Sequence, residues 1–358
     1  MEELITGFFR EAAECGVAEA QLILGLMHYD GLGVPQDYEE AARWFLKAAE
    51  QGDAEVQSFL GNMYYEGRGV PQDYQEAARW YLKAAEQGGA EVQYRLGWLY
   101  GEGLGVPQDY EEAASWYRKA AEQGHPIAQN NLGVSYDKGQ GIPQDHEEAA
   151  RWYRKAAEQG YAIAQNNLGV SYDNGRGVPQ DHEEAARWYW KAAEQGYAIA
   201  QYNLGVSYYL GQGVLQDYQE AARWFRESAE QGYDDAQNSL GEMNYFGRGV
   251  PQDYQEAVRW YRKAAEQGDA VAQNNLARSY FFGQGVTKDA KTAYVWLNVA
   301  VPNLTGEIKE IATKIREGIG KELTPEQLAE AKKISAEWRP NGEPFDFRRP
   351  RAGAGTKK

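Results

Sequence analysis

The chain has 358 residues, of which 43% are hydrophobic and 13% aromatic, a composition typical of a folded protein. Its formal net charge of −16 argues against nucleic acid as a partner, because phosphate backbones are bound by basic faces. Cys15 is the only cysteine, so neither an internal disulfide nor a cysteine-rich zinc site can form. No run of 18 apolar residues occurs, and we expect no membrane-spanning segment.

The first residues do not resemble an export signal. Met1 is followed by two glutamates, and neither a basic region nor a cleavable apolar stretch comes after them. The sequence as it stands therefore predicts a cytoplasmic protein. A periplasmic or secreted protein is the alternative if a signal peptide has been removed.

A repeat of 36 residues organises most of the chain. Glutamine, leucine, a Gly-x-Gly pair and tryptophan recur eight times in one register without an insertion, beginning with Gln21, Leu24, Gly31 and Trp44. Self-similarity at such a period is typical of solenoid proteins. We expect a half repeat at 1–17 that holds helix B only, followed by eight repeats at 18–53, 54–89, 90–125, 126–161, 162–197, 198–233, 234–269 and 270–301.

Each repeat predicts two helices, called helix A and helix B here. In the fifth repeat, helix A is expected at about 162–173, where Leu168 and Tyr172 follow helical spacing. Gly169 lowers helix propensity, so its recurrence indicates the close approach of a neighbouring helix. Gly175 should end helix A, because glycine adopts the left-handed cap conformation without a steric clash.

Helix B begins after a Pro-Gln-Asp sequence. Asp181 is a suitable N-cap, and Glu184 three residues later completes a capping-box pattern. Trp188 and recurring alanines then form the apolar stripe, and Gly196 ends the helix. The Gly-x-Gly pairs superficially resemble a phosphate-binding loop, but no strand precedes them and no Gly-Lys-Ser/Thr follows. We therefore interpret them as helix caps.

The last part of the chain departs from the repeat. We expect capping helices at 302–338, with Ile308, Ile311, Ile315 and Ile319 on one of them and a capping box from Thr324 to Gln327 on the other. The aperiodic tail at 339–358 is expected to be mostly disordered. Its Phe345 and Phe347 are candidates for holding part of the tail against the array.

The repeat sequences closely resemble one known family. Residues 162–181 read Ala-Ile-Ala-Gln-Asn-Asn-Leu-Gly-Val-Ser-Tyr-Asp-Asn-Gly-Arg-Gly-Val-Pro-Gln-Asp, and Glu-Ala-Ala-Arg-Trp-Tyr follows. This pattern resembles the Sel-one-like repeats, relatives of tetratricopeptide repeats, over about 18–301. The resemblance implies an all-α fold, a right-handed α/α superhelix (a solenoid) with helices A on its concave face. Family members are generally adaptors in signalling, membrane-protein quality control, or envelope and host interaction in bacteria. The intra-repeat cysteines of some secreted members are lacking here.

Catalytic and metal-binding patterns are not evident. The four histidines, His28, His125, His146 and His182, replace other residues within the repeat register and lack the spacing of metal ligands. The carboxylates and serines are periodic too, so neither a glycosidase pair nor a Ser-His-Asp arrangement stands out. We therefore expect no enzyme, no metal and no cofactor, and no residue pattern supports a hydrolase.

A ligand would contact positions of helix A that differ between repeats, since scaffold positions stay constant. By resemblance to tetratricopeptide grooves these positions line the concave face, where asparagine amides can clamp a peptide backbone. Recent duplication would also make neighbouring repeats alike, so this interpretation has an alternative. We name the candidate ligand-binding residues the variable strip: Tyr94, Trp98, Asn130, Val134, Asp137, Asn166, Val170, Asp173, Tyr202, Val206, Tyr209, Asn238, Tyr245, Asn274 and Phe281.

Three functions remain open. The first is a non-catalytic scaffold that binds a protein or peptide on the concave face, as an adaptor in complex assembly or signalling. The second is a bacterial protein that binds carbohydrate or cell-envelope fragments by stacking them on Tyr94, Trp98, Tyr202, Tyr209 and Tyr245. The third is a regular array without a ligand. In each case we expect a monomer that contacts neither nucleic acid nor membrane.

Overall fold

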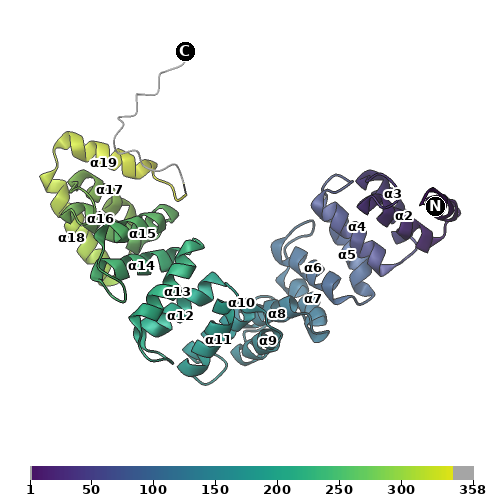
Figure 1. Cartoon of the computed structure of the whole chain (residues 1–358), viewed down its shortest axis with the longest axis horizontal. Coiled ribbons are helices and arrows are strands. Elements are labelled where there is room, and N and C mark those ends of the chain that lie inside the picture. Colours follow the sequence, from purple (N-terminus) through teal and green to yellow (C-terminus); the bar gives the residue numbers. More distant parts are fainter. Residues whose placement is uncertain (1, 342–358) are drawn as a thin grey trace, which may run out of the picture. The chain divides into compact units, whose positions relative to one another are not determined.

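The computed structural model describes residues 2–341, and the side chains of residues 6–341. Its described part is all helical, with nineteen α-helices and one short 3-10 helix, and consecutive helices pair as helix A and helix B of 36-residue repeats (Figure 1). This confirms the predicted all-α solenoid class. The chain divides between Gln180 and Asp181 into two compact units.

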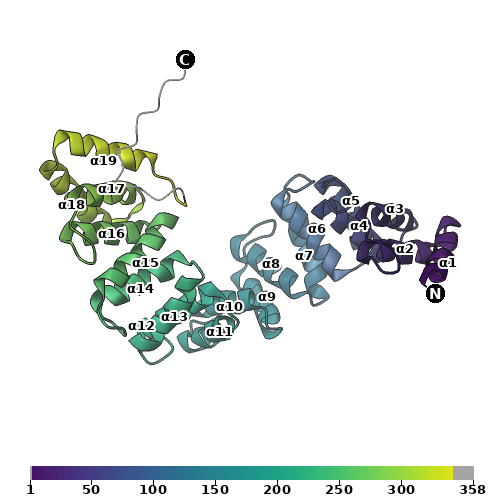
Figure 2. The same cartoon turned by 45° about the horizontal axis from the view of Figure 1, so that its top comes forward.

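The first unit contains α1 to α10. Helix α1 is followed by alternating helices A (even numbers) and helices B (odd numbers), and each packs on the next along the chain (Figure 2). Their bounds are α1 (Glu2–Glu14), α2 (Ala18–Asp30), α3 (Tyr38–Ala49), α4 (Ala54–Glu66), α5 (Tyr74–Glu86), α6 (Ala90–Glu102), α7 (Tyr110–Glu122), α8 (Pro126–Lys138), α9 (His146–Glu158) and α10 (Ala162–Asn174).

The second unit contains α11 to α19. It continues the alternation through α17, and α18 and α19 then pack against α17. The bounds are α11 (His182–Glu194), α12 (Ala198–Leu210), α13 (Tyr218–Glu230), α14 (Asp234–Phe246), α15 (Tyr254–Gln267), α16 (Ala270–Phe282), α17 (Ala290–Ala300), η1 (Val301–Asn303), α18 (Gly306–Glu322) and α19 (Pro325–Glu337).

The turn between helix A and helix B is set by short-range hydrogen bonds. In the first repeat, Gly31 ends α2 in the left-handed conformation, with φ of 72°. The Gln36 amide then donates to the Tyr29 carbonyl at 2.9 Å, so it occupies a carbonyl that the helix end leaves unpaired. Asp37 accepts from the backbone N–H of Glu40 at 3.0 Å and starts α3. The helix-cap interpretation of the glycines is therefore confirmed.

The capping box predicted at Asp181 is only half formed. Asp181 accepts from the Glu184 N–H at 3.0 Å, as expected of an N-cap. The Glu184 carboxylate does not return a bond to the N-cap backbone; it accepts from Trp188 Nε1 at 2.9 Å and from Arg187 at 3.4 Å. Donors one turn along helix B thus compete for this carboxylate, and the predicted second half was wrong. At Thr324 and Gln327 both halves are present, at 3.2 and 3.0 Å.

The glycine inside helix A faces an aromatic ring. A Cβ on Gly61 would lie 2.5 Å from Cδ1 of Tyr81, on helix B of the same repeat. The predicted close approach of a helix is confirmed, and the ring explains it. In the eighth repeat Ala277 takes the place of this glycine, and Leu297 takes the place of the ring in the same buried cluster. The smaller side chain on helix B leaves room for the larger one on helix A.

The second glycine of each Gly-x-Gly pair lies against the preceding repeat. Gly69 has φ of 72°, and a Cβ there would lie 2.0 Å from the Tyr38 carbonyl oxygen at the start of α3. Only a residue without a side chain allows this turn to approach the previous helix B so closely. The glycine pair therefore combines a helix cap with a contact between repeats.

The register glutamines take part in a set of hydrogen bonds that recurs from repeat to repeat. Gln57 donates to the Ala49 carbonyl at 3.1 Å, and its Oε1 accepts from Gln87 at 3.0 Å. Gln87 also donates to the Gly52 carbonyl at 2.9 Å. These bonds satisfy buried polar atoms between helices and between repeats. At the last repeat the Oε1 of Gln273 has no hydrogen-bond partner among the described residues.

The tryptophans fill the space between successive helices B. Trp152 is 9% exposed and packs with Tyr117 of the preceding helix B and Leu132 of α8. Lys155 places its Nζ 3.7 Å from the Trp152 ring, so its charge covers the solvent side of the indole. Within each unit, a repeat thereby buries its apolar face against the next one, as expected of a solenoid.

The two C-terminal helices cover the last repeat. Ile319 and Ala331 are buried in the same cluster as α17, and Trp338 packs against it. Ile308 and Ile311, predicted to share the apolar stripe, are 47% and 49% exposed, so the contacting face of α18 begins further along the helix. Phe345 and Phe347, with the rest of the tail from residue 342, lie outside the described residues.

Candidate binding site

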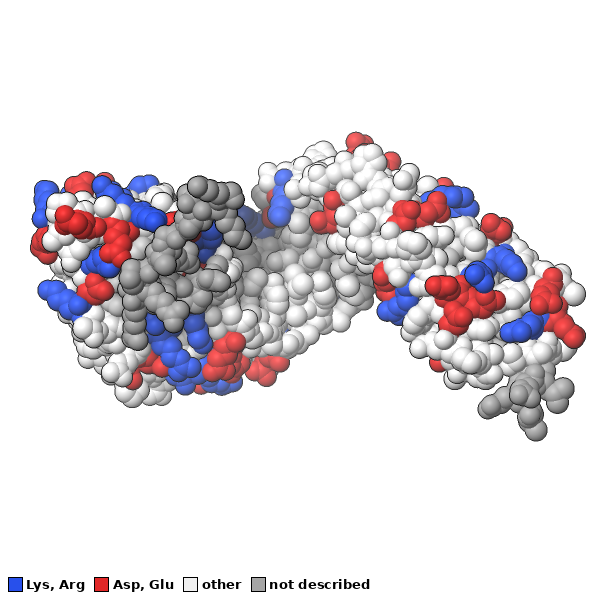
Figure 3. All heavy atoms as spheres, turned by 90° about the horizontal axis from the view of Figure 1, so that it is seen from above, with Lys and Arg blue, Asp and Glu red and all other residues white. Residues whose placement is uncertain are grey.

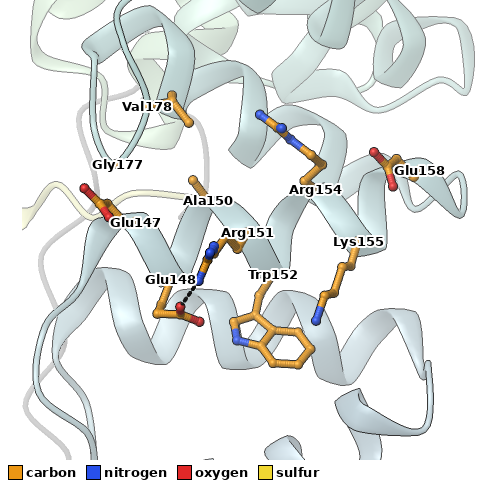
Figure 4. Close-up of a pocket in the computed structure, with 10 residues that line it drawn as sticks. All are labelled: Glu147, Glu148, Ala150, Arg151, Trp152, Arg154, Lys155, Glu158, Gly177 and Val178. Carbon is orange, nitrogen blue, oxygen red and sulfur yellow. Dashed lines mark hydrogen bonds and ion pairs between the residues drawn. The ribbon is translucent and has the colours of Figure 1, made fainter.

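A groove beside helix B recurs with the repeat. In the first unit it is lined by Glu147, Glu148, Trp152 and Lys155 of α9 and has a volume of about 500 Å³ (Figure 4). Glu148 accepts from Arg151 at 2.6 Å across its floor. Residues at equivalent register positions line further grooves within 111–145 and 183–214. Because the groove follows the register, it is a feature of the scaffold and does not single out a site.

A second kind of hollow is lined mainly by helices A. It lies in the first unit, has a volume of about 240 Å³, and includes two residues of the variable strip, Tyr94 and Trp98. We name it the aromatic hollow; it is lined by Tyr65, Tyr81, Tyr94, Arg95, Trp98 and Leu99.

The rings of the aromatic hollow form a corner. The Tyr65 and Trp98 rings lie 5.9 Å apart, centroid to centroid, and are inclined at 74°. Tyr94 stacks on the His125 imidazole at 4.9 Å and 20°. Edge-to-face and offset-stacked pairs are the favoured arrangements of aromatic side chains, so these contacts hold the rings in place.

Arg95 is the one charged side chain that lines the aromatic hollow, and a network of hydrogen bonds fixes it. Its Nε donates to Glu91 Oε1 at 2.7 Å, and the positive charge of its guanidinium lowers the pKa of Tyr81 against the larger, raising effect of burial. The second oxygen of Glu91 lies 2.9 Å from His125 Nε2. His125 Nδ1 accepts from the Ala128 N–H at 3.2 Å, so in the neutral ring Nε2 carries the proton and donates it to Glu91.

The charge of Glu91 is stabilised by this network. Burial by itself raises the pKa of Glu91, but hydrogen bonds from His125 and Arg95 outweigh it and hold the pKa below its ordinary value. Burial raises the pKa of Tyr81 to about 12, so its hydroxyl stays protonated and donates to Asn62 at 2.6 Å. The aromatic hollow therefore presents a fixed arginine whose charge is balanced by one carboxylate.

The asparagines of the variable strip are more buried than expected of side chains that clamp a peptide backbone. Asn130 and Asn166 are 4% and 5% exposed, and Asn130 Oδ1 accepts from Asn167 at 3.0 Å. Asp137 accepts from His146 Nδ1 at 2.9 Å. Val134, Val170 and Asp173 are half-buried.

The second unit repeats the asparagine pairing. Asn238 Oδ1 accepts from Asn275 at 3.0 Å, and Asn274 is 8% exposed. Tyr209 accepts a hydrogen bond from Arg248, and the Tyr245 hydroxyl donates to Gln284. The remaining members of the variable strip here, Tyr202, Val206 and Phe281, are half-buried.

Two acidic residues lie among these side chains. Glu242 is half-buried, and burial raises its pKa although Asn275 donates to it. Burial raises the pKa of Asp269 to about 6, and the nearby charges of Asp235 and Asp234 add to the shift. The second unit thus holds carboxylates that are poorly hydrated.

Sequence comparison places Tyr65 and Arg95 at varying positions of helix A without selecting them as ligand-binding residues, and it misses Glu91 and His125. Tyr65 lies in the last turn of α4, Glu91 and Arg95 lie on α6, and His125 precedes α8. A signal for Arg95 existed, because comparison of the eight repeats shows no other charged residue at its register position. The role of His125 depends on its side-chain contacts with Glu91 and Tyr94 on helix A of the same repeat, which periodicity does not reveal.

Charges are intermingled elsewhere on the surface. On the face that Figure 3 shows, Asp and Glu lie beside Lys and Arg over much of the described part. Many are pairs within one helix B, such as Arg187 with Glu183 at 2.7 Å. Within residues 2–341, no three His, Cys, Asp or Glu side chains gather in a way that could hold a metal ion. No helix in that range has the length and apolar character needed to cross a membrane.

The helix pairs, the recurring glutamine hydrogen bonds and the glycine contacts define a helical repeat protein of the solenoid class. The Sel1 repeat model matches residues 18–53, 54–89, 90–125, 126–161, 162–197, 198–233, 234–269 and 270–300. The chain belongs to the Sel1 repeat family.

Solved structures agree with this assignment. The chain is 35% identical to a Sel1 repeat protein from Oxalobacter formigenes, over 86% of this chain and 89% of that chain, with a TM-score of 0.69. It is 36% identical to a protective antigen of uropathogenic Escherichia coli strains that displays an SLR fold, over 93% of this chain and 78% of that one, with a TM-score of 0.56. No match is found among curated proteins.

Proposed function

We propose that this chain is a non-catalytic scaffold that binds a protein or peptide along helices A. The observation that carries the proposal is the aromatic hollow, where Tyr94, Arg95 and Trp98, at helix A positions that vary between repeats, line one cavity. Tyrosine, tryptophan and arginine are the residues that contribute most to the affinity of protein interfaces.

The absence of catalytic geometry fits this proposal. The polar groups around the aromatic hollow are joined to one another, and Glu91 is held in its charged form by His125 and Arg95. A general acid or base needs a pKa close to the working pH, but the pKa of Glu91 is lowered and so lies further from neutral pH. We infer that these groups position side chains for binding.

A carbohydrate ligand is the second candidate, because exposed aromatic rings can stack on sugars. The ring geometry favours a peptide. A sugar lies flat on one ring, whereas Tyr65 and Trp98 meet at 74° and enclose a corner. Soluble fragments of bacterial cell wall, tested for binding to the immobilised full chain, distinguish a carbohydrate ligand from a peptide.

Selection from a random-peptide phage library on the immobilised full chain tests the proposal. We expect enriched peptides whose binding is lost with Trp98→Ala and kept with Trp190→Ala, a matched change at a tryptophan that is 50% exposed on helix α11. Failure to enrich any sequence, or enrichment that is equal on both variants, contradicts the proposal.

A further inference from the structure

The aromatic hollow differs from the surrounding scaffold in the kind of group it can accept. Its walls are Tyr65, Tyr94 and Trp98, with Leu99 behind them, and they enclose about 240 Å³. Binding sites of this kind gain affinity mainly from apolar contact and gain orientation from a few polar groups. Here Arg95 supplies the polar group.

We infer that the aromatic hollow takes an uncharged, apolar side chain of a partner peptide, while the peptide carbonyl beside that side chain accepts a hydrogen bond from Arg95. This inference rests on the proposed scaffold function and specifies the chemistry of the partner at one position. The corner formed by Tyr65 and Trp98 contacts a compact side chain on two sides.

Charge excludes the other ligand classes. Aromatic rings can also enclose a cation, but the only charged side chain that lines this hollow is the cationic Arg95, so a cation finds no carboxylate to contact there. An anion meets an arginine whose charge Glu91 already balances at 2.7 Å, in a chain with a net charge of −16. A neutral hydrogen-bond acceptor needs neither a carboxylate nor an unbalanced positive charge. It needs only an available N–H group of Arg95.

Arg95 has such groups. A guanidinium carries five N–H donors. Nε donates to Glu91, and no other hydrogen bond from Arg95 is found within the described residues. The Arg95 side chain is 38% exposed, so its remaining donors are open to a ligand in the aromatic hollow.

The arginine is also held in position before a ligand binds. Glu91 bridges Arg95 and His125, and His125 is fixed by the α8 backbone and by stacking on Tyr94. Preorganisation of this kind reduces the entropy lost on binding. Glu91 and His125 are therefore positioning residues for Arg95.

Capped amino acids test this chemistry without knowledge of the natural partner. The full chain is labelled with 5-fluorotryptophan, and the Trp98 signal is assigned in the 19F NMR spectrum from its loss in Trp98→Phe. N-acetyl-leucine amide and N-acetyl-phenylalanine amide should shift the Trp98 signal in a saturable way. N-acetyl-lysine amide and N-acetyl-aspartate amide should not. Equal shifts from the charged and the apolar amides overturn the inference.

Variants of Arg95 test the hydrogen bond. Arg95→Leu should weaken binding of N-acetyl-leucine amide about tenfold, because a hydrogen bond from a charged donor is lost. Binding of toluene, which has no carbonyl, should not weaken. Arg118→Leu, on helix α7 outside the aromatic hollow, is the matched control. Unchanged affinity of the amide in Arg95→Leu, or in Arg95→Gln if the first variant does not fold, overturns the role of Arg95.

The two proposals can fail separately. Library peptides that depend on Trp98, together with capped amides that leave the Trp98 signal unmoved, contradict this inference and leave the scaffold function standing. Amides that bind the aromatic hollow while no library peptide binds the chain contradict the scaffold function.

Discussion

Asn167 donates a hydrogen bond of 3.0 Å from its side-chain amide to Oδ1 of Asn130, one repeat earlier. The same relationship joins Asn275 to Asn238 in the second unit. These bonds connect successive helices A, so the asparagines contribute to the array whether or not they contact a ligand. A ligand that clamps to Asn130 would have to replace this bond.

Asn130→Ala should lower the free energy of unfolding by about 1 kcal/mol, because it leaves the Asn167 amide without its acceptor. Chemical denaturation followed by circular dichroism measures the change. The double variant Asn130→Ala with Asn167→Ala should lose less than the sum of the two single variants. Additive losses would show that the two side chains do not interact in solution.

Gly133→Ala should destabilise the chain, although alanine is the better helix former. The new Cβ would lie 2.6 Å from Cε1 of Tyr153, and overpacking of this kind costs about 1–3 kcal/mol. Adding Tyr153→Leu should restore part of the loss, since Ala277 and Leu297 form that combination in the eighth repeat. A Gly133→Ala variant as stable as the parent would contradict the packing described for this position.

Leu215→Pro should stabilise the chain. Leu215 is 90% exposed, and six other repeats have proline at this position. Among the described residues its N–H donates to no backbone acceptor, so proline removes no hydrogen bond. A compatible proline stabilises by about 0.4–1 kcal/mol because it restricts the unfolded chain. A lower melting temperature in the variant would show that this turn differs from its counterparts.

The pH dependence of stability should include a contribution from Asp269. Burial raises the pKa of Asp269 from 3.8 in the ordinary case to about 6 in the folded chain. The folded state therefore binds the Asp269 proton more tightly than the unfolded state. The stability that this proton contributes at low pH is lost as the pH rises from about 3.8 to about 6. Glu242, whose pKa burial also raises, contributes in the same direction.

Asp269→Asn keeps an N-cap acceptor for α16 and removes the buried charge. The variant should be more stable than the parent at pH 7, and the difference should shrink toward pH 4. Asp253→Asn, the same change at the N-cap of α15, separates the effect of the cap from that of the charge. Parallel stability curves for Asp269→Asn and the parent across this range would contradict the assignment.

The sequence was sufficient to predict the repeat fold. Gln57, Leu60, Gly61 and Trp80 stand at register positions whose roles depend on helix periodicity and on contacts that every repeat shares. Helix ends were predicted within a residue, as at Asn174, because glycine and Asp caps act locally. The capping box at Asp181 failed because it depends on competing donors that lie a turn away.

The candidate site could be predicted only in part. Tyr94 and Trp98 were identified because they vary between repeats. The network of Glu91, Arg95 and His125 depends on the last residue of the repeat, His125, contacting the first turn of helix A in the same repeat, and no periodic pattern encodes this contact. Likewise the burial of Asn130 follows from its neighbour Asn167 and not from its own residue type.

The central claim is that helices A bind a peptide at the aromatic hollow, and isothermal titration of one library-selected peptide tests it most directly. The dissociation constant should rise at least about tenfold with Trp98→Ala, since truncation of a central tryptophan removes about 2 kcal/mol or more of binding free energy. It should stay unchanged with Trp190→Ala. A dissociation constant that is the same for Trp98→Ala and the parent chain would contradict the account.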